Sequence, residues 1–335
     1  MPVRAVFVHL GQRNPPHLWP NIKRHLRLFP EIPVSLVLGD KRHIRRVPPG
    51  VEILPYDRSE ETNIVLRNLS RDENFRQGFW HLTLERLMAL EVAHNAHVGE
   101  AMLHIESDVI LMPSFPWDLF ENKHLLMWGE ASAVEDIAAL IFSPEAGLTR
   151  KLASFTREQA AHIHDTNDMR TLRAFYDQNL DLVEKLPIEI GGRGSTDVFD
   201  VLAIGMWLGG MDPSNARGVR TYHISMPHHT VNASMYKYSV AEGQLTIESE
   251  SQRALIHSLH IHSKDMRLFG PQWEKRLSQL VELANRKPHP VRRFSFAGFL
   301  SWFREFVREV TSKKFAVAVI RRLAGLLRIS GSTPN

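Results

Sequence analysis

The first 112 residues alternate between short apolar runs and longer segments with helical spacing, and this alternation limits the possible folds more than any other feature. The apolar runs at 3–10, 34–38, 51–54 and 103–112 have the length and the Val, Ile and Leu content of buried strands. Segments 19–28 and 79–93 place apolar side chains three and four positions apart, as helices do. The repetition predicts an α/β domain with a mostly parallel sheet flanked by helices.

The second half of the chain is less regular. Residues 138–142 and 254–261 are predicted as strands, and 145–155, 169–184, 198–208 and 272–284 as helices. Two prolines, Pro288 and Pro290, end the last of these helices, and the composition changes after them. We therefore expect one α/β domain over 1–286 and a separate helical tail over 291–330.

Composition excludes several classes of site. The 335 residues contain no cysteine, so disulfides, thiolate metal sites and cysteine nucleophiles are impossible. The start of the chain lacks the apolar core of a signal peptide, and no run reaches the ~20 apolar residues of a membrane span. These features favour a cytoplasmic protein. The net charge of +4 is uneven, because residues 291–335 alone carry nine Lys and Arg against two Glu.

Two carboxylates interrupt the apolar stretch LHIESDVILMPSF at 103–115. Glu106 and Asp108 are two residues apart, so in a strand both side chains point to the same side. Ligands of open α/β sheets bind beyond the carboxyl ends of the strands. Two neighbouring carboxylates repel each other, and a divalent ion with oxygen ligands, Mg²⁺ or Mn²⁺, relieves the repulsion. The alternative is a solvated pair at a strand end.

A second polar group follows the apolar run ALIHSLHI, in the sequence HIHSK at 260–264. His262 is predicted as a third metal ligand, since imidazole suits an ion such as Mn²⁺. Lys264 is predicted to hold a diphosphate oxygen as a point charge. His257, just upstream, is interpreted instead as a packed histidine of a half-buried strand.

In this order and spacing, these motifs resemble those of GT-A glycosyltransferases, the nucleotide-diphospho-sugar transferase superfamily. Glu106-Ser107-Asp108 is similar to the Asp-x-Asp motif that holds the metal against the diphosphate, with Glu in the first position. His262 matches the late histidine that completes the metal shell. The segments GFWHLTLERLMALE and VFDVLAIGMWLGGMDPSNARG resemble, respectively, the helix before the metal motif and a region of bacterial polysaccharide transferases. The resemblance covers residues 1–286 and implies transfer of a sugar to a glycan or lipid-linked acceptor in cell-surface polysaccharide synthesis.

Further residues are predicted to bind the nucleotide-sugar. They follow the first two strands, lie on the helix before the metal motif, or lie within the motif itself: His9, Gly11, Arg13, Asp40, Arg86 and Ser107. Two of them have equally plausible structural roles. Asp40 could be a turn residue after Gly39, and Arg86 could belong to a solvated helix face or pair with Glu85.

An inverting transferase also needs a carboxylate base for the acceptor hydroxyl. Asp197 and Asp200 are the candidates, because they follow a glycine-rich loop at 191–194 and precede a predicted helix. One of them could instead cap that helix, a role for which Ser195 and Thr196 compete. The stereochemistry of transfer stays open, and a retaining enzyme would not need this base.

The tail combines an apolar stripe with cations. In 296–310 the apolar residues recur with helical spacing, and 313–328 repeats the pattern with five Lys and Arg. This is typical of a helix lying on an anionic membrane surface, and it predicts a peripheral protein on the cytoplasmic face. The alternative is packing on the catalytic domain or on a second copy in a homodimer. Nucleic acid is disfavoured, because the aromatic residues lie on the apolar face, away from the cations.

Two other functions fit the same polar residues. A metal-dependent phosphohydrolase or nucleotidyltransferase would also use an acid-x-acid pair with His-x-His. A non-catalytic, membrane-associated scaffold of the same fold would bind no nucleotide.

Overall fold

The computed structural model describes residues 1–69, 78–191, 196–211, 219–222, 229–286, 291–294, 299 and 303. Its central sheet has seven strands in the order β3-β2-β1-β4-β7-β6-β8. The strands are β1 (Val3–His9), β2 (Val34–Leu38), β3 (Val51–Pro55), β4 (Ala101–Ile105), β6 (Leu126–Ser132), β7 (Glu135–Ser143) and β8 (Val183–Lys185). Neighbouring strands are parallel except where β7 pairs with β4 and β6. The predicted α/β class, with a mostly parallel sheet flanked by helices, is confirmed.

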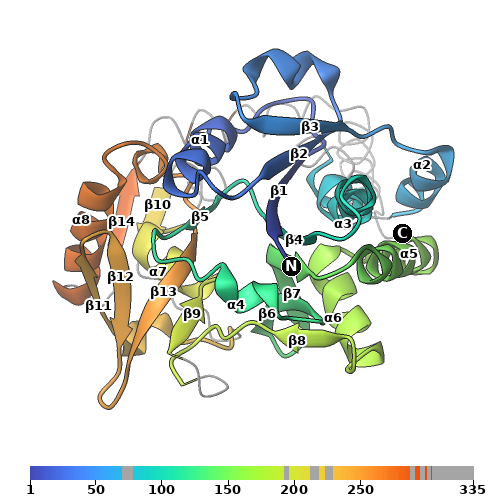
Figure 1. Ribbon diagram of the computed structural model, residues 1–335. Helices are drawn as coiled ribbons and strands as arrows, with labels where there is room; N and C mark the ends of the chain where they lie inside the picture. Colours follow the sequence, from blue (N-terminus) through green and yellow to red (C-terminus); the bar gives the residue numbers. More distant parts are fainter. Residues whose placement is uncertain are drawn as a thin grey trace, which may run out of the picture.

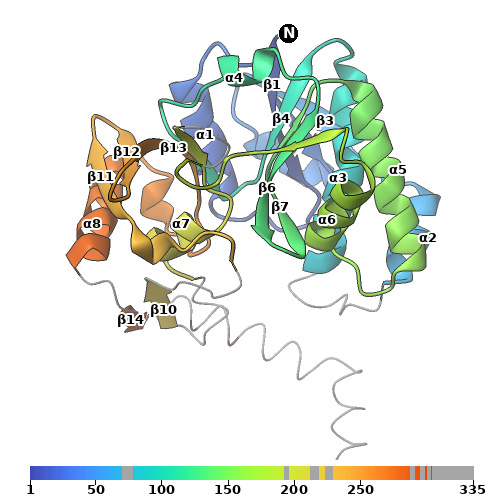
Figure 2. The ribbon, with the colours of Figure 1, turned by 90° about the horizontal axis from the view of Figure 1, so that it is seen from below.

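Helices cover both faces of this sheet (Figures 1 and 2). One face packs against α3 (Phe79–Ala96), α5 (Ala146–His162) and α6 (Asp168–Gln178), with α2 (Glu60–Arg67) outside them. The other face packs against α1 (Leu18–Leu28) and the short α4 (Asp118–Glu121). These helices have the apolar spacing that the sequence shows for 19–28 and 79–93. The sheet is therefore buried on both sides, which accounts for its continuous apolar strands.

A second, mostly antiparallel sheet lies beside the first, at the left of Figure 1. It contains β11 (Lys237–Ala241), β12 (Gln244–Glu248), β13 (Arg253–His260) and β5 (Val109–Leu111) in that order, and β9 (Asp197–Phe199) pairs with β13. Its core is closed by α7 (Ala203–Gly209) and α8 (Trp273–Arg286). The described residues also include three short 3-10 helices: η1 (Lys41–Arg46), η5 (Ala233–Met235) and η6 (Met266–Leu268).

The stretch 103–115 crosses from one sheet to the other. β4 belongs to the seven-stranded sheet, whereas β5 pairs with β13 in the second sheet. Glu106, Ser107 and Asp108 form the link between the two strands. The carboxylates that seem to interrupt a single buried strand thus occupy the seam between two sheets, where the backbone leaves one set of hydrogen bonds and enters another.

Three predicted segments differ in the structure. Residues 198–208 contain a strand, β9, before α7, and 169–184 end in β8 after α6. Residues 291–294, predicted as the start of the helical tail, form β14 (Val291–Phe294), which pairs with β10 (Val219–Tyr222). A pattern of apolar residues over a few positions does not distinguish a short buried strand from a helical turn.

The remainder of the predicted tail, apart from 299 and 303, lies outside the described residues, as does most of the glycine-rich loop at 191–194. Within the part of the chain that the structure describes, no helix has the length and apolarity needed to cross a bilayer.

Candidate metal and nucleotide-sugar site

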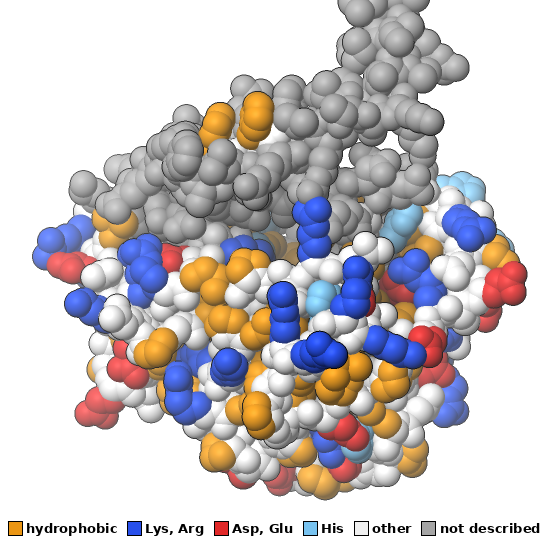
Figure 3. Space-filling view, turned by 90° about the horizontal axis from the view of Figure 1, so that it is seen from above, with side chains coloured by type: hydrophobic (Ala, Val, Ile, Leu, Met, Phe, Trp, Pro, Cys, Tyr) orange, Lys and Arg blue, Asp and Glu red, His pale blue; other side chains and the backbone are white. Residues whose placement is uncertain are grey.

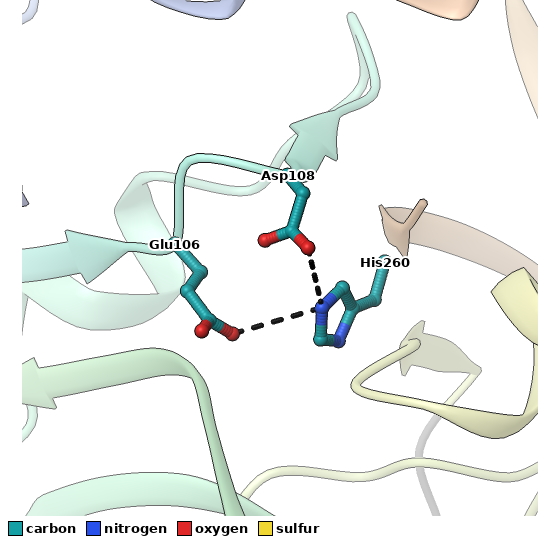
Figure 4. Close-up of side chains that lie close together, drawn as sticks. All are labelled: Glu106, Asp108 and His260. Carbon is teal, nitrogen blue, oxygen red and sulfur yellow. Dashed lines mark ion pairs between the residues drawn. The ribbon is translucent and has the colours of Figure 1, made fainter. Parts of the chain in front are cut away.

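Glu106, Asp108 and His260 converge at the seam between the sheets (Figure 4). Each residue offers one ligand atom, and these three atoms lie within 4.8 Å of one another. The Nε2 atom of His260 is 3.3 Å from Asp108 Oδ2 and 3.7 Å from Glu106 Oε2. Two carboxylates and an imidazole in this arrangement suit a divalent ion such as Mn²⁺ or Mg²⁺.

Helix α1 holds the link in place. Asn21 Nδ2 donates hydrogen bonds to the carbonyl oxygens of Ser107 and Val109, at 3.1 and 2.7 Å. His17, at the start of the helix, contacts Ser107 Oγ at 3.1 Å, and Arg24 donates to the carbonyl of Leu111. These three residues follow one another at spacings of four and three, so they lie on one helix face. Buried polar side chains thus satisfy the backbone that the two sheets leave unpaired.

The His260 ring is oriented by its other nitrogen. Nδ1 lies 2.7 Å from the carbonyl oxygen of Val201, which can only accept, so Nδ1 carries the hydrogen. In the neutral ring, Nε2 then presents a lone pair to the two carboxylates. Three electron-rich atoms facing one another require a cation between them, either a proton on Nε2 or a metal ion.

His262, the predicted third ligand, lies beside His260 and lines the pocket next to the cluster. β13 ends at His260, and the backbone N–H of His262 donates to the carbonyl of His260, so the strand alternation stops there. The His262 ring packs on the His260 ring with centroids 4.0 Å apart. Burial lowers the pKa of His262 well below its ordinary value. Among the described residues, His260 completes the ligand cluster, and His262 lines the adjacent pocket.

Two cations balance the carboxylates. Lys264 Nζ contacts Asp108 Oδ2, and Lys264 has a left-handed backbone (φ 52°). Arg86 pairs with Glu106 and, at 2.8 Å, with Asp168 Oδ2. Although burial alone would raise the pKa of Glu106, the Arg86 guanidinium and the neighbouring His260 and Lys264 hold that pKa well below its usual range. Glu106 is therefore ionised and available as a ligand at neutral pH.

A pocket of about 490 Å³ opens beside the cluster. Its polar end contains Glu106, Asp108, His260, His262 and Lys264, and Asp168 lies on its wall. The rest is largely apolar and comes from α3, β7, α6 and α7 and the residues next to them: Phe79, Trp80, Thr83, Ile137, Ala138, Met169, Leu202, Met206 and Met211. The volume is in the range of small-ligand sites, and the charged groups converge at one end as orienting groups do.

Asp168 is a residue that the sequence prediction missed. It is the first residue of α6, its side chain is buried, and Arg86 connects it to Glu106. Burial raises the pKa of Asp168 despite the nearby Arg86 guanidinium. Asn167 caps the helix by accepting from the Arg170 N–H, so Asn-Asp reads as an ordinary helix start. The sequence therefore offers no signal that separates Asp168 from an ordinary first residue of a helix.

The remaining predicted nucleotide-sugar residues lie around the ends of β1 and β2. His9 ends β1 and is buried, and burial together with His43 lowers its pKa to about 4. Gly11 and the exposed Arg13 are in the following loop. Asp40 caps η1, accepting from the Arg42 N–H at 2.9 Å and pairing with the Arg42 side chain, which is the turn role left open by the sequence. Ser107 faces His17, as described above.

Asp197 and Asp200, the predicted bases, have other partners. Asp200 is 2% exposed and accepts from four backbone N–H groups: Leu202, Ile204, Gly205 and His260, at 2.8–3.1 Å. Asp197 Oδ1 lies 2.7 Å from His257 Nε2. Asp197 pairs in register with Leu255, five residues before His260, which places it about 16 Å along β13 from the cluster. Neither residue is among those that line the pocket.

Comparison with known proteins gives a likeness in structure alone. No protein-family model matches the chain, and no curated protein matches its sequence. Among solved structures, it is similar to the glycosyltransferase GlyE of Streptococcus pneumoniae TIGR4, at 15% identity and a TM-score of 0.38, over 56% of this chain and 45% of GlyE. It is also similar to the galactosyltransferase LgtC in complex with donor and acceptor sugar analogues, at 13% identity and a TM-score of 0.38, over 59% of this chain and 76% of LgtC.

This chain therefore spans less than half the length of GlyE. At such identities and scores the activity has to be inferred from the site itself.

Proposed function

We propose that the protein is a metal-dependent glycosyltransferase that moves a sugar from a nucleotide-diphospho-sugar to a glycan or lipid-linked acceptor. The observation that carries the proposal is the convergence of Glu106, Asp108 and the Nε2 lone pair of His260 at the end of a parallel strand, beside a 490 Å³ pocket. Ligands of α/β sheets bind at this edge. The motifs described from the sequence supply the expectation of sugar transfer, and a role in cell-surface polysaccharide synthesis rests on them too.

The donor set fits Mn²⁺ or Mg²⁺, with Glu106, Asp108 and His260 as the protein ligands. Such an ion, when bound, would neutralise the diphosphate and stabilise it as a leaving group. Lys264 is the cation nearest to Asp108, and we assign it to a diphosphate oxygen once the carboxylate has another partner. Arg86 forms ion pairs with Glu106 and Asp168, so we assign it to positioning these carboxylates and not to direct diphosphate binding.

The acceptor side of the reaction involves Asp168 in this proposal. Of the carboxylates that line the pocket, it is the one outside the ligand cluster. Burial raises the pKa of Asp168, which makes it a stronger base than an exposed carboxylate. A general base must lie within hydrogen-bonding reach of the hydroxyl that it deprotonates. We assign Asp200 to holding the end of β13 and Asp197 to the pair with His257. The nucleotide would extend from the cluster toward His9, Gly11, Arg13 and Ser107.

A donor screen tests the proposal. Thermal denaturation of the full chain is measured with UDP-, GDP- and CMP-sugars, each with and without Mn²⁺ or Mg²⁺. We expect one nucleotide class to raise the melting temperature in a metal-dependent manner, and the Asp108→Asn variant to lose that shift. Release of inorganic phosphate without sugar transfer would favour a phosphohydrolase. Absence of any nucleotide effect would favour a non-catalytic scaffold.

Membrane attachment through the tail is a separate proposal and rests on the sequence pattern after residue 295. Because β14 pairs with β10, truncation after residue 294 is a cleaner test than truncation at 290. The truncated protein should stay folded and retain donor binding, and it should bind vesicles with anionic lipid more weakly than the full chain. Aggregation of the truncated protein, with no vesicle binding by the full chain, would show that the tail is a packing element.

A further inference from the structure

The 3-10 helix η1 presents four cations on the protein surface. Lys41, Arg42, Arg45 and Arg46 are exposed, and Ile44 between them is 43% exposed. We call these five residues the basic turn. Figure 3, which views the molecule from the side on which β3 lies in Figure 1, shows Lys and Arg side chains gathered on this face.

The basic turn is anchored from below. His43, the remaining residue of η1, is buried, and its Nε2 lies 3.0 Å from the carbonyl oxygen of Gln12. Its ring packs on His9 with centroids 5.3 Å apart. Asp40 caps the first turn. Because these contacts use the backbone and the inward-facing side chain, the cations and Ile44 are held outward without contributing to the core.

The charge of the turn is largely unopposed. Asp40 pairs with Arg42, but no ion pair among the residues that the structure describes involves Lys41, Arg45 or Arg46. Arg13 adds a cation in the loop that His43 contacts. Such a surface attracts polyanions over a distance set by the salt concentration.

The basic turn lies at the same edge of the sheet as the candidate site. It follows β2, whose carboxyl end is parallel to those of β1 and β4. β1 ends at His9 and β4 leads to Glu106. A flat anionic surface contacted by the turn would therefore lie on the side of the molecule toward which the pocket residues converge.

We propose that the basic turn is a docking surface for an anionic lipid bilayer, independent of the C-terminal tail. The positive charge would suit any polyanion, but Ile44 favours a lipid bilayer over a soluble polyanion. An exposed aliphatic side chain surrounded by cations suits the boundary between headgroups and acyl chains. A protein surface that binds single-stranded nucleic acid would instead offer an aromatic ring for stacking on bases, and the basic turn has none. The docked orientation keeps the carboxyl edge of the sheet near the bilayer.

The test compares two full-length triple variants with equal net charge. Lys41→Gln/Arg45→Gln/Arg46→Gln neutralises the turn, and Arg67→Gln/Lys151→Gln/Lys275→Gln removes three exposed cations from α2, α5 and α8. Co-sedimentation is measured with vesicles of phosphatidylcholine alone and with 30% phosphatidylglycerol. We expect the turn variant to bind the anionic vesicles at least tenfold more weakly than the control variant, and Ile44→Ser to bind severalfold more weakly than the native chain.

Equal binding by the two triple variants would overturn the proposal, as would failure of the native chain to bind anionic vesicles. Heparin and single-stranded DNA serve as soluble polyanions in the same assay. If the turn variant loses binding to them as strongly as to vesicles, and Ile44→Ser loses neither, the partner is a soluble polyanion instead of a bilayer. Circular dichroism and the melting temperature confirm that each variant is folded.

Discussion

Two segments of the molecule each carry two carboxylates, but the surroundings of these carboxylates differ. Glu106 and Asp108 face side chains, namely Arg86, Lys264 and His260, and they line a pocket. Asp200 faces four backbone N–H groups, and Asp197 is paired with His257. A carboxylate whose lone pairs are filled by the backbone cannot accept a ligand without breaking the fold.

Side-chain partners differ because they can turn away. Lys264 sits on a turn after β13, and its long side chain can leave Asp108 when a stronger cation or a phosphate arrives. The backbone amides that donate to Asp200, from β13 and from the start of α7 and the residue before it, have no such freedom. The difference between the Glu106–Asp108 pair and Asp200 thus lies in whether the partners can exchange, and exchange is what a binding site requires.

The largest effect should come from removing the backbone-bound carboxylate. Asp200→Ala would leave four backbone N–H groups, three of them in buried hydrogen bonds, without their acceptor, and hydrogen bonds to charged groups contribute about 1.5–3 kcal/mol each. We expect the free energy of unfolding in urea to fall by about 4 kcal/mol or more. A loss below about 1 kcal/mol would show that Asp200 does not organise this corner.

Asp108→Asn should affect turnover rather than folding. The change removes a charged ligand and leaves the shape of the link, so we expect turnover to fall by a factor of ~10² or more, about 3 kcal/mol in the barrier. Asp197→Asn is the matched control, and its turnover should stay within about twofold of that of the native chain. Steady-state kinetics with the donor found in the screen measure both. Similar losses in the two variants would erase the distinction between the segments.

Gly205→Ala tests how the backbone around Asp200 positions His260, the proposed metal ligand. A Cβ atom at Gly205 would lie 1.9 Å from the carbonyl oxygen of His260 and 2.8 Å from Asp200 Oδ2, so the end of β13 must shift. We expect about 2 kcal/mol of destabilisation, as overpacking costs, and weaker Mn²⁺ binding by calorimetry. At Gly209, in the same helix, the nearest atom would be 3.5 Å away, so Gly209→Ala should leave Mn²⁺ affinity unchanged.

A buried histidine, His25, should make the stability of the fold depend on pH. His25 is enclosed by Phe7, Phe29 and Trp117, and burial together with Arg24 lowers its pKa to about 3. Below pH 6.5 the unfolded chain binds a proton that the folded chain does not, so stability falls as the pH drops toward 3.

At pH 5.5 the unprotonated state of buried His25 should lower the free energy of unfolding by about 1.4 kcal/mol, and His25→Phe should remove that part of the pH dependence. Urea unfolding at pH 7.5 and 5.5 measures it, with His124→Phe at an exposed position as the control. An unchanged slope in His25→Phe would mean that this ring is not the one that titrates.

The sequence predicted β1, β2, β3, β4 and β7 of the central sheet because each of them carries its own apolar run, whereas β6 was not predicted and β8 lies at the end of a predicted helix. It also predicted Glu106 and Asp108 as neighbours, since that needs only local alternation. It could not assign β4 and β5 to different sheets, because strand partners come from distant segments such as β13. For the third ligand, the sequence shows two nearby histidines, His260 and His262, but not the turn after His260 that leaves His260 facing the two carboxylates. For Asp200, the sequence shows the carboxylate but not the four amides that saturate it.

The crossing of the chain between two sheets also has a thermodynamic consequence. Glu106 follows β4 of the seven-stranded sheet, while Asp108 precedes β5 and His260 ends β13 of the second sheet, so an ion that bound all three would cross-link the two sheets. By linkage, an ion at one hundred times its dissociation constant adds about 2.7 kcal/mol to the state in which the two sheets hold these ligands together. Amide hydrogen exchange should therefore slow on both sides of the seam when the ion is added, in β4 and in β13 alike.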